Sequence, residues 1–218
     1  MVAMIGGDLT GLRIVVLAAG FSTRMGRSKA LVGVGGVSLI RRTVSLLAQF
    51  AANDIVVVTA PRATRLRVEL RGYPVSMITN PRPARGLSSS VIRALRETRH
   101  SAATMLLPVD LGELMPQDIA RMISRWRSAR RRVVARGIDG RAATPLILPK
   151  WLYARAQRLV GDVGLRSLIA ALPPDQQLLI EVSSAVRDVD SPQDLAAVRR
   201  RYSHNRAIRG KSLVRYIP

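Results

Sequence analysis

Short apolar runs rich in β-branched residues alternate with amphipathic helical patterns through the first 130 residues of this chain. A strand of a parallel sheet has such a continuous apolar run, because helices cover both faces of the sheet and neither face meets water. The alternation therefore predicts an α/β fold, a Rossmann-like and mostly parallel sheet with helices on both faces. The expected strands are residues 13–18, 54–59, 75–79 and 104–109, and the expected helices are residues 37–49, 62–70, 87–98 and 116–130.

The second half of the chain has a less regular pattern. A turn is expected at Asp139-Gly140, and one domain is expected over residues 1–202, followed by a basic tail of weak periodicity over residues 203–218. The further expected strands are residues 132–137, 145–148 and 177–182, and the further helical patterns cover residues 151–160, 165–172 and 192–201.

Composition narrows the class of protein. The chain has 218 residues, enough to bury a core without covalent staples, and it contains no cysteine, which excludes disulfides and thiolate metal sites. No apolar run approaches the roughly 20 residues that cross a bilayer. Residues 1–10 lack the basic start and long apolar stretch of a signal peptide. We therefore expect a soluble, cytoplasmic protein.

The formal net charge of +21 favours anionic partners. Basic residues concentrate in two segments, residues 121–136 and residues 199–215. Each segment is either a solvated basic surface or a functional polyanion site. We find no recognised nucleic-acid-binding module beside them, which argues against nucleic acid as the partner.

Small and polar residues follow the first expected strand, in the segment LAAGFSTRMGRSKAL at residues 17–31. Ligands of parallel sheets bind beyond the carboxyl ends of the strands. Gly20 allows backbone amides to approach an anion closely, and Ser22 adds a hydroxyl donor. Arg24 can grip two phosphate oxygens, and Lys29 supplies a compact positive charge. The segment lacks the Gly-Lys-Ser/Thr of a Walker A loop, so its chemistry alone fits either a triphosphate-binding loop or an ordinary basic turn.

Residues 17–31 resemble the L-A-A-G-x-S-x-R-M-G-x-x-K-x-L signature of the MobA-like nucleotidyltransferases at every fixed position, and most closely the molybdenum cofactor cytidylyltransferase branch. The likeness extends over residues 13–198 and implies a fold similar to that of nucleotide-diphospho-sugar transferases. Three further segments resemble the family motifs N-x(5)-G-x-x-x-S, G-D-x-G-x-R and D-I-D-T-P-E-D-L, at residues 80–90, 161–166 and 188–195 respectively.

The resemblance implies where a nucleoside triphosphate would bind. Asn80 lies in the segment that resembles the family's base-contacting motif, although the serines at residues 88–90 could also simply begin the helix at Val91. The implied nucleotide-binding residues are Leu17, Ala18, Ala19, Gly20, Ser22, Arg24, Lys29, Asn80, Ser89 and Ser90.

Two aspartates are candidates for a magnesium site. By position alone, Asp110 either holds Mg²⁺ or caps the next helix, since it follows the fourth expected strand. The resemblance implies the metal role, with Asp190 as the second ligand. Asp190 could instead cap the helix that begins at Ser191, and Asp188 competes with it for the metal.

The implied reaction transfers a CMP-type group from CTP to a phosphorylated small acceptor and releases pyrophosphate. In the molybdenum cofactor cytidylyltransferase branch, this acceptor is molybdopterin. The implied catalytic residues are Arg24, Lys29 and Asp110, and a molybdoenzyme or a cofactor chaperone is a possible protein partner. Because a phosphate acceptor is already ionised, the chemistry needs positioning and charge neutralisation rather than a protein nucleophile.

Two segments depart from the family pattern. Leu111-Gly112 stand where the family has Gln-Pro, and Ala143 and Thr144 replace the second glycine and the histidine of G-x-x-G-H-P. Both segments border the acceptor side in the family. They motivate the alternative hypothesis, a non-catalytic or differently specific nucleotide-binding member of the same fold.

Overall fold

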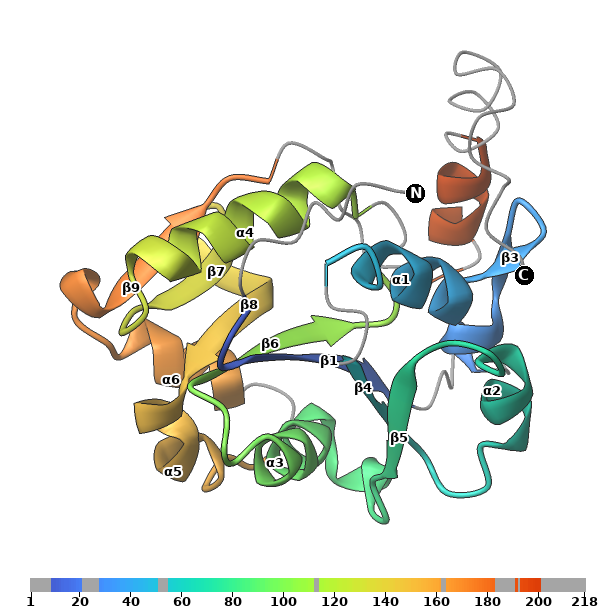
Figure 1. The fold of residues 1–218 in the computed structure, drawn as a ribbon, viewed down its shortest axis with the longest axis horizontal. Helices are drawn as coiled ribbons and strands as arrows, with labels where there is room; N and C mark the ends of the chain where they lie inside the picture. Colours follow the sequence, from blue (N-terminus) through green and yellow to red (C-terminus); the bar gives the residue numbers. More distant parts are fainter. Residues whose placement is uncertain are drawn as a thin grey trace.

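A computed structural model of the chain describes residues 9–20, 28–50, 55–111, 114–161, 164–182, 191 and 193–200. Its centre is a seven-stranded sheet with the strand order β5-β4-β1-β6-β8-β7-β9, and helices lie on both sides of it (Figure 1). The strands of this sheet are β1 (Leu12–Ala18), β4 (Ile55–Thr59), β5 (Val75–Thr79), β6 (Ala103–Pro108), β7 (Val133–Ile138), β8 (Arg141–Pro149) and β9 (Gln177–Ile180).

Most strand pairs are parallel, as the alternating pattern predicts. β1 pairs in parallel with both β4 and β6, β4 with β5, and β7 with β9, whereas β8 runs antiparallel to its two neighbours, β6 and β7. The chain builds the sheet outward from β1 through β4 to β5, and then returns to place β6 on the other side of β1. The strand order therefore reverses between β1 and β6, the place where open α/β sheets bind their ligands.

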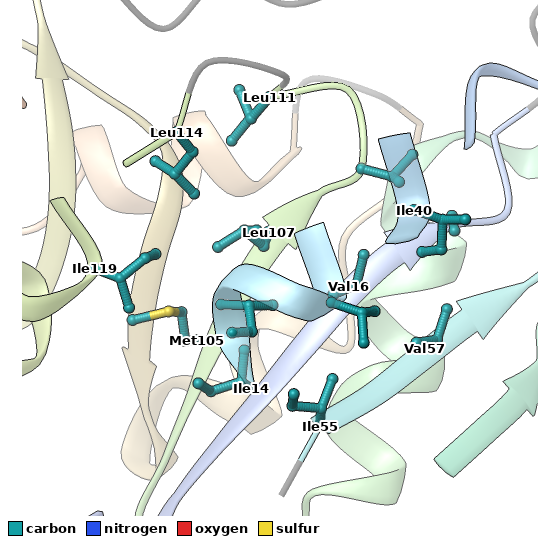
Figure 2. Packing of buried hydrophobic residues seen from close by; sticks show 14 of the residues in the cluster. Ile14, Val16, Ile40, Ile55, Val57, Met105, Leu107, Leu111, Leu114 and Ile119 are labelled. Atoms are coloured by element: carbon teal, nitrogen blue, oxygen red, sulfur yellow. The ribbon is translucent and has the colours of Figure 1, made fainter. Parts of the chain in front are cut away.

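The side chains of β1 alternate between the two faces of the sheet. Ile14 and Val16 belong to one buried cluster, and Val15 and Leu17 belong to the other. Figure 2 shows the first cluster, in which Ile14 and Val16 lie among apolar side chains of the neighbouring strands and helices. The sheet is thus covered on both faces, which explains why its central strands have no polar alternation.

Two layers of helices provide this cover. Buried residues of α1 (Leu39–Leu47), α4 (Pro116–Ser128) and a helix at residues 193–200 belong to the first cluster. Buried residues of α3 (Leu87–Glu97), α5 (Tyr153–Ala156) and α6 (Gly164–Ala170) belong to the second. The remaining elements are α2 (Thr64–Glu69), the 3-10 helices η2 (Lys29–Leu31), η3 (Pro83–Arg85), η4 (Lys150–Leu152) and η5 (Pro174–Gln176), and a hairpin of β2 (Gly33–Val34) with β3 (Val37–Ser38).

The structure differs from the sequence-based expectations in three places. β8 is longer than the expected strand at residues 145–148, because the turn at Asp139-Gly140 folds residues 141–144 back onto β7. Both turn residues have positive φ, 49° and 72°, as tight hairpins require. The expected helix at residues 151–160 is only η4 and α5, since the fully buried face ends at Ala156 and Val160 is 86% exposed. The β2–β3 hairpin was not predicted, because each strand has only two residues.

None of the helices in the described ranges combines the length and the apolarity needed to cross a membrane.

Candidate active site

The candidate site lies at the carboxyl ends of β1 and β6, where the strand order of the sheet reverses. β1 ends at Ala18 and leads to Gly20, and β6 ends at Pro108 and leads to Asp110. The pairing of Leu17 with Pro108 sets the two strand ends side by side. Residues far apart in the sequence therefore meet at one edge of the sheet.

The end of β1 presents backbone rather than side chains. Leu17, Ala18 and Ala19 are at most 6% exposed, and their side chains belong to the two core clusters, so only their main-chain groups can face a ligand. Gly20 is exposed, and a Cβ built on it would meet nothing within 4 Å among the described residues. This open space is what a backbone that closely approaches a phosphate group needs. Ser22 and Arg24, the other predicted residues of this loop, lie outside the described residues.

Lys29 and Asp110 form an ion pair across this edge. The Lys29 Nζ lies 3.0 Å from the Asp110 Oδ2, and the two side chains are 21% and 18% exposed. Lys29 begins η2, whose Ala30 is buried in the core and fixes the path of the segment. The structure thus brings together the two described members of the predicted catalytic set, Lys29 and Asp110, although 81 residues separate them.

Asp110 does not cap the following helix, so that alternative is wrong. At the start of α4, the Asp118 carboxylate accepts a hydrogen bond from the backbone N–H of Met115, at 3.0 Å. Asp118 is 1% exposed and performs the capping role. The Asp110 carboxylate instead lies at the partly open edge of the sheet.

The structure also shows how the helix at residues 193–200 is capped. Ser191 Oγ accepts a hydrogen bond from the backbone N–H of Asp194, and the Asp194 carboxylate accepts from the backbone N–H of Ser191. This reciprocal pair is a capping box in which Ser191 is the cap. Asp188 and Asp190 themselves lie outside the described residues, and their metal role stays a prediction.

The donor set at this edge is compatible with a hard divalent cation. Asp110 supplies a carboxylate, and such cations are commonly held by one or two carboxylates together with phosphate oxygens and waters. In the described ranges, no group of three or more His, Cys, Asp or Glu side chains converges to form a complete protein cage.

Asn80 organises the segment that was predicted to contact the base. Its side-chain amide donates to Ser89 Oγ at 2.8 Å and to Ser90 Oγ at 3.0 Å, and its Oδ1 accepts from the backbone N–H of Arg82 at 3.0 Å. Asn80 is only 2% exposed, whereas Ser89 is half-buried and its hydroxyl donates to the Gly86 carbonyl. The serines also lie in the first turn of α3, as the alternative interpretation expected, and contact with the base stays a prediction.

A contact that sequence reasoning missed links two of the motifs. The backbone N–H of Ser88 donates to the Gly161 carbonyl at 3.1 Å, which joins residues 86–90 to the start of the 161–166 segment. Gly161 has a φ of 74°, a conformation that favours glycine. The glycine of the motif was the available signal, but a sequence pattern does not indicate which distant backbone a turn will meet.

The acceptor-side departures place apolar groups at the same edge. β8 pairs Leu146 with Leu106, and its residues 141–144 continue beyond that pair toward the carboxyl end of β6. Ala143 is 6% exposed, and the Thr144 carbonyl accepts from Arg136 at 3.5 Å. Leu111 is buried in the core beside Leu114 (Figure 2). Neither Ala143 nor Leu111 offers a polar side chain to an acceptor.

Comparison with known protein families agrees with this geometry. The family model described as a MobA-like NTP transferase domain matches residues 14–178, which include most of β1, Lys29, the Asn80 cluster and Asp110. The chain belongs to the MobA-like NTP transferase family. It is accordingly a nucleotidyltransferase, as the segment at residues 17–31 predicts.

One curated relative has a name that refers to the molybdenum cofactor. A Rhodopirellula baltica protein named probable molybdenum cofactor guanylyltransferase is 31% identical over 188 residues, which cover 83% of this chain and 88% of the relative. The name of that relative specifies a guanylyl group, whereas the resemblance noted above favours a cytidylyl group.

Solved structures share the fold of this MobA-like chain. A nucleotidyl transferase from Methanothermobacter superposes with a TM-score of 0.73 at 22% identity, over 89% of this chain and 98% of that one. A Mycobacterium tuberculosis protein in complex with manganese gives 0.67 at 20% identity, over 88% and 99%. A CMP:2-keto-3-deoxy-manno-octonic acid synthetase in complex with CTP gives 0.71 at 14% identity, over 90% and 100%. At these identities the likeness establishes the fold, and the sheet is that of nucleotide-diphospho-sugar transferases.

Proposed function

We propose that this protein transfers a cytidylyl group from CTP to the phosphate of a small acceptor of the molybdopterin type, and that it releases pyrophosphate. The observation that carries the proposal is the Lys29–Asp110 pair at the reversal point of the sheet, beside Gly20, where a built Cβ would meet none of the described atoms within 4 Å. The Lys29 ammonium can bind the triphosphate there, and the Asp110 carboxylate can bind the metal ion that accompanies it, so both ligands would lie at the same edge of the sheet.

The chemistry follows from charges and positions. An oxygen of the acceptor phosphate attacks the α-phosphorus in line, the bond from the α-phosphorus to the bridging oxygen breaks, and pyrophosphate leaves. The acceptor oxygen is already ionised near neutral pH, so no protein group has to remove a proton. The work of the protein is to position the two phosphates and to stabilise the charge that develops.

Named residues perform these tasks. The backbone at Gly20 approaches the triphosphate, and the Lys29 ammonium binds its oxygens. Asp110 would hold a divalent cation, Mg²⁺ by the resemblance, and such a cation when bound neutralises phosphate charge. Arg24 and Asp190 complete the set as sequence-based predictions.

The donor base is the finer part of the proposal. The Ser89 hydroxyl, aligned by Asn80, presents a small polar group of the kind that can read the edge of a pyrimidine. GTP is the second candidate, because the Rhodopirellula relative is named as a guanylyltransferase. Calorimetry with CTP, GTP, ATP and UTP in the presence of Mg²⁺ decides between them.

We expect CTP to bind most tightly in that experiment. A preference for GTP would leave the protein a nucleotidyltransferase and change only its donor nucleotide. Dissociation constants no lower than millimolar for all four nucleotides would overturn the proposal. Pyrophosphate release with molybdopterin tests the acceptor. If nucleotide binds but no acceptor yields pyrophosphate, the apolar groups at Ala143 and Leu111 mark a non-catalytic member of the family.

A further inference from the structure

The helix at residues 193–200 packs against the segment that follows Lys29. Its Leu195 and Val198 are 4% and 3% exposed, and they belong to the same core cluster as Val32 and Val34. In Figure 1 this red helix stands beside the hairpin that contains β3. The chain thus places one of its last described elements against one of its first.

Arg199 makes the polar contact of this packing. Its Nε donates to the Gly33 carbonyl at 3.1 Å and its Nη2 donates to the same oxygen at 2.9 Å, across 166 residues of sequence. Two donors of one planar guanidinium on one carbonyl fix both the distance and the direction of the contact. Gly33 begins the β2–β3 hairpin.

Backbone hydrogen bonds connect that hairpin to Lys29. The backbone N–H of Val32 donates to the Lys29 carbonyl at 3.0 Å, and the backbone N–H of Leu39 donates to the Val32 carbonyl at 2.9 Å. Ala30 and Val32 are at most 1% exposed. The three residues between Lys29 and Gly33 are therefore held by backbone hydrogen bonds and by core packing, so a restraint on Gly33 also restrains the Lys29 backbone.

We propose that Arg199 is a positioning residue for the nucleotidyl transfer: by holding Gly33, it keeps the Lys29 ammonium at the place where it meets Asp110 and the triphosphate. The inference rests on the proposed function, in which Lys29 binds the triphosphate. Arg199 is exposed and does not itself need to touch the nucleotide.

The test compares four variants of the full chain: Arg199→Ala, Arg199→Lys, Lys29→Ala and the double variant Arg199→Ala/Lys29→Ala. Arg200→Ala is the matched control, since Arg200 is the exposed neighbour on the same helix. The measurements are the Kd for the preferred nucleotide, kcat and KM, thermal melting, and hydrogen exchange of the peptide that covers residues 29–39. Hydrogen exchange reports how firmly the hairpin is held, and this readout does not depend on the protein being an enzyme.

We expect Arg199→Ala to speed exchange at residues 29–39 and to weaken nucleotide binding roughly five- to tenfold, a typical coupling between residues of one network. Arg199→Lys should recover part of both effects, and Arg200→Ala should change neither. In the Lys29→Ala background, removal of Arg199 should have no further effect on nucleotide affinity.

Three results would overturn the inference. Exchange at residues 29–39 that is unchanged in Arg199→Ala would mean that the contact does not restrain the hairpin. Faster exchange with wild-type nucleotide affinity, or equal losses with and without Lys29, would mean that Arg199 only stabilises the fold. A wild-type protein that binds no nucleotide would instead refute the proposed function, and the exchange data would still report the restraint itself.

Discussion

The Lys29 ammonium lies 3.0 Å from the Asp110 carboxylate, where the strand order of the sheet reverses between β1 and β6. Lys29 follows β1 and Asp110 follows β6, so their meeting depends on the parallel pairing of these two strands. Each residue neutralises the other in the absence of ligand. When a triphosphate and its cation bind, the Lys29–Asp110 ion pair would be replaced by a contact of Lys29 with the triphosphate and a contact of Asp110 with the cation. The first two predictions follow from this replacement.

Asp110→Asn should separate nucleotide binding from turnover. Without the carboxylate, Lys29 no longer faces a competing negative charge, so the affinity for nucleotide in the absence of metal should stay the same or rise by up to roughly fivefold. Turnover with metal should fall by at least about 100-fold, because charge neutralisation at the phosphates is lost. Calorimetry with and without Mg²⁺ and a pyrophosphate assay measure the two effects. Asp175→Asn is the control, since Asp175 is exposed at η5. Full turnover in Asp110→Asn would refute the role of this residue.

Lys29→Ala should weaken both ground-state binding and turnover. The loss of one charge-assisted phosphate contact costs on the order of 1.5–3 kcal/mol, roughly 10- to 150-fold. Lys150→Ala is a matched control, because Lys150 is exposed and follows β8 at the opposite edge of the sheet, where Pro149 pairs with Ala103.

Arg24→Ala provides a contrast, as a prediction from the sequence alone. Its guanidinium contact should strengthen as the α–β bond breaks, so kcat should fall more than affinity. Steady-state kinetics of the three variants, with melting curves to check folding, measure these effects. Wild-type kinetics in both Lys29→Ala and Arg24→Ala would mean that the triphosphate binds elsewhere.

Gly20→Ala should leave the fold intact and impair the site. A Cβ at this position meets no described atom within 4 Å, and its φ is not in the region reserved for glycine. The free energy of unfolding should therefore change by less than about 1 kcal/mol. A methyl group in the space that the phosphates need should weaken nucleotide binding by about tenfold or more. Denaturant unfolding and calorimetry measure both quantities, and unchanged affinity would show that no phosphate approaches Gly20.

Asn80→Ala should affect stability and base selectivity together. The substitution leaves the buried Ser90 hydroxyl and the Arg82 backbone N–H without their Asn80 partner, which should cost about 1–3 kcal/mol of unfolding free energy. The Ser89 hydroxyl would also lose its alignment, so the ratio of affinities between CTP and the other nucleotides should approach one. Urea unfolding and competition binding measure these changes. A destabilised variant that keeps its selectivity would limit Asn80 to a structural role.

Burial of the Tyr153 hydroxyl predicts that the free energy of unfolding depends on pH, independently of the candidate active site. Its hydroxyl lies 2.5 Å from Thr104 Oγ1 in a buried network with Thr98, and burial is the main cause that raises the pKa of Tyr153 above its ordinary value near 10. Because the unfolded tyrosine ionises first, its contribution to stability is complete below about pH 10 and is lost as the pH rises above that value. The stability difference between wild type and Tyr153→Phe should therefore shrink between about pH 9 and pH 11. Urea unfolding across that range measures it, and a constant difference would contradict the assignment.

Local pattern was enough to predict the central strands. β5 begins and ends where the sequence predicts, and β1, β4 and β6 differ by one residue at their ends, since continuous β-branched runs between polar turns leave little choice. Lys29 and Asp110, which the structure brings together, were also candidates from the sequence, through a family signature and a carboxylate after a strand. Capping by Asp110 or Asp190 was only the alternative to the metal role, and the structure shows caps that involve Asp118 and Asp194, through local geometry that a spacing rule does not resolve.

The sequence by itself determined the fold class, the positions of most elements and the residue types at the edge of the sheet, because these depend on periodicity and local chemistry. Only the tertiary structure decided that β8 runs antiparallel between β6 and β7. It also decided that the Ser88 backbone N–H donates to the Gly161 carbonyl and that the Arg199 guanidinium donates to the Gly33 carbonyl. Each of these contacts joins segments that are far apart or unmarked in the pattern. They form where burial of the two core clusters brings backbone groups together, and a hydrogen bond to a distant carbonyl leaves no periodic signal in the chain.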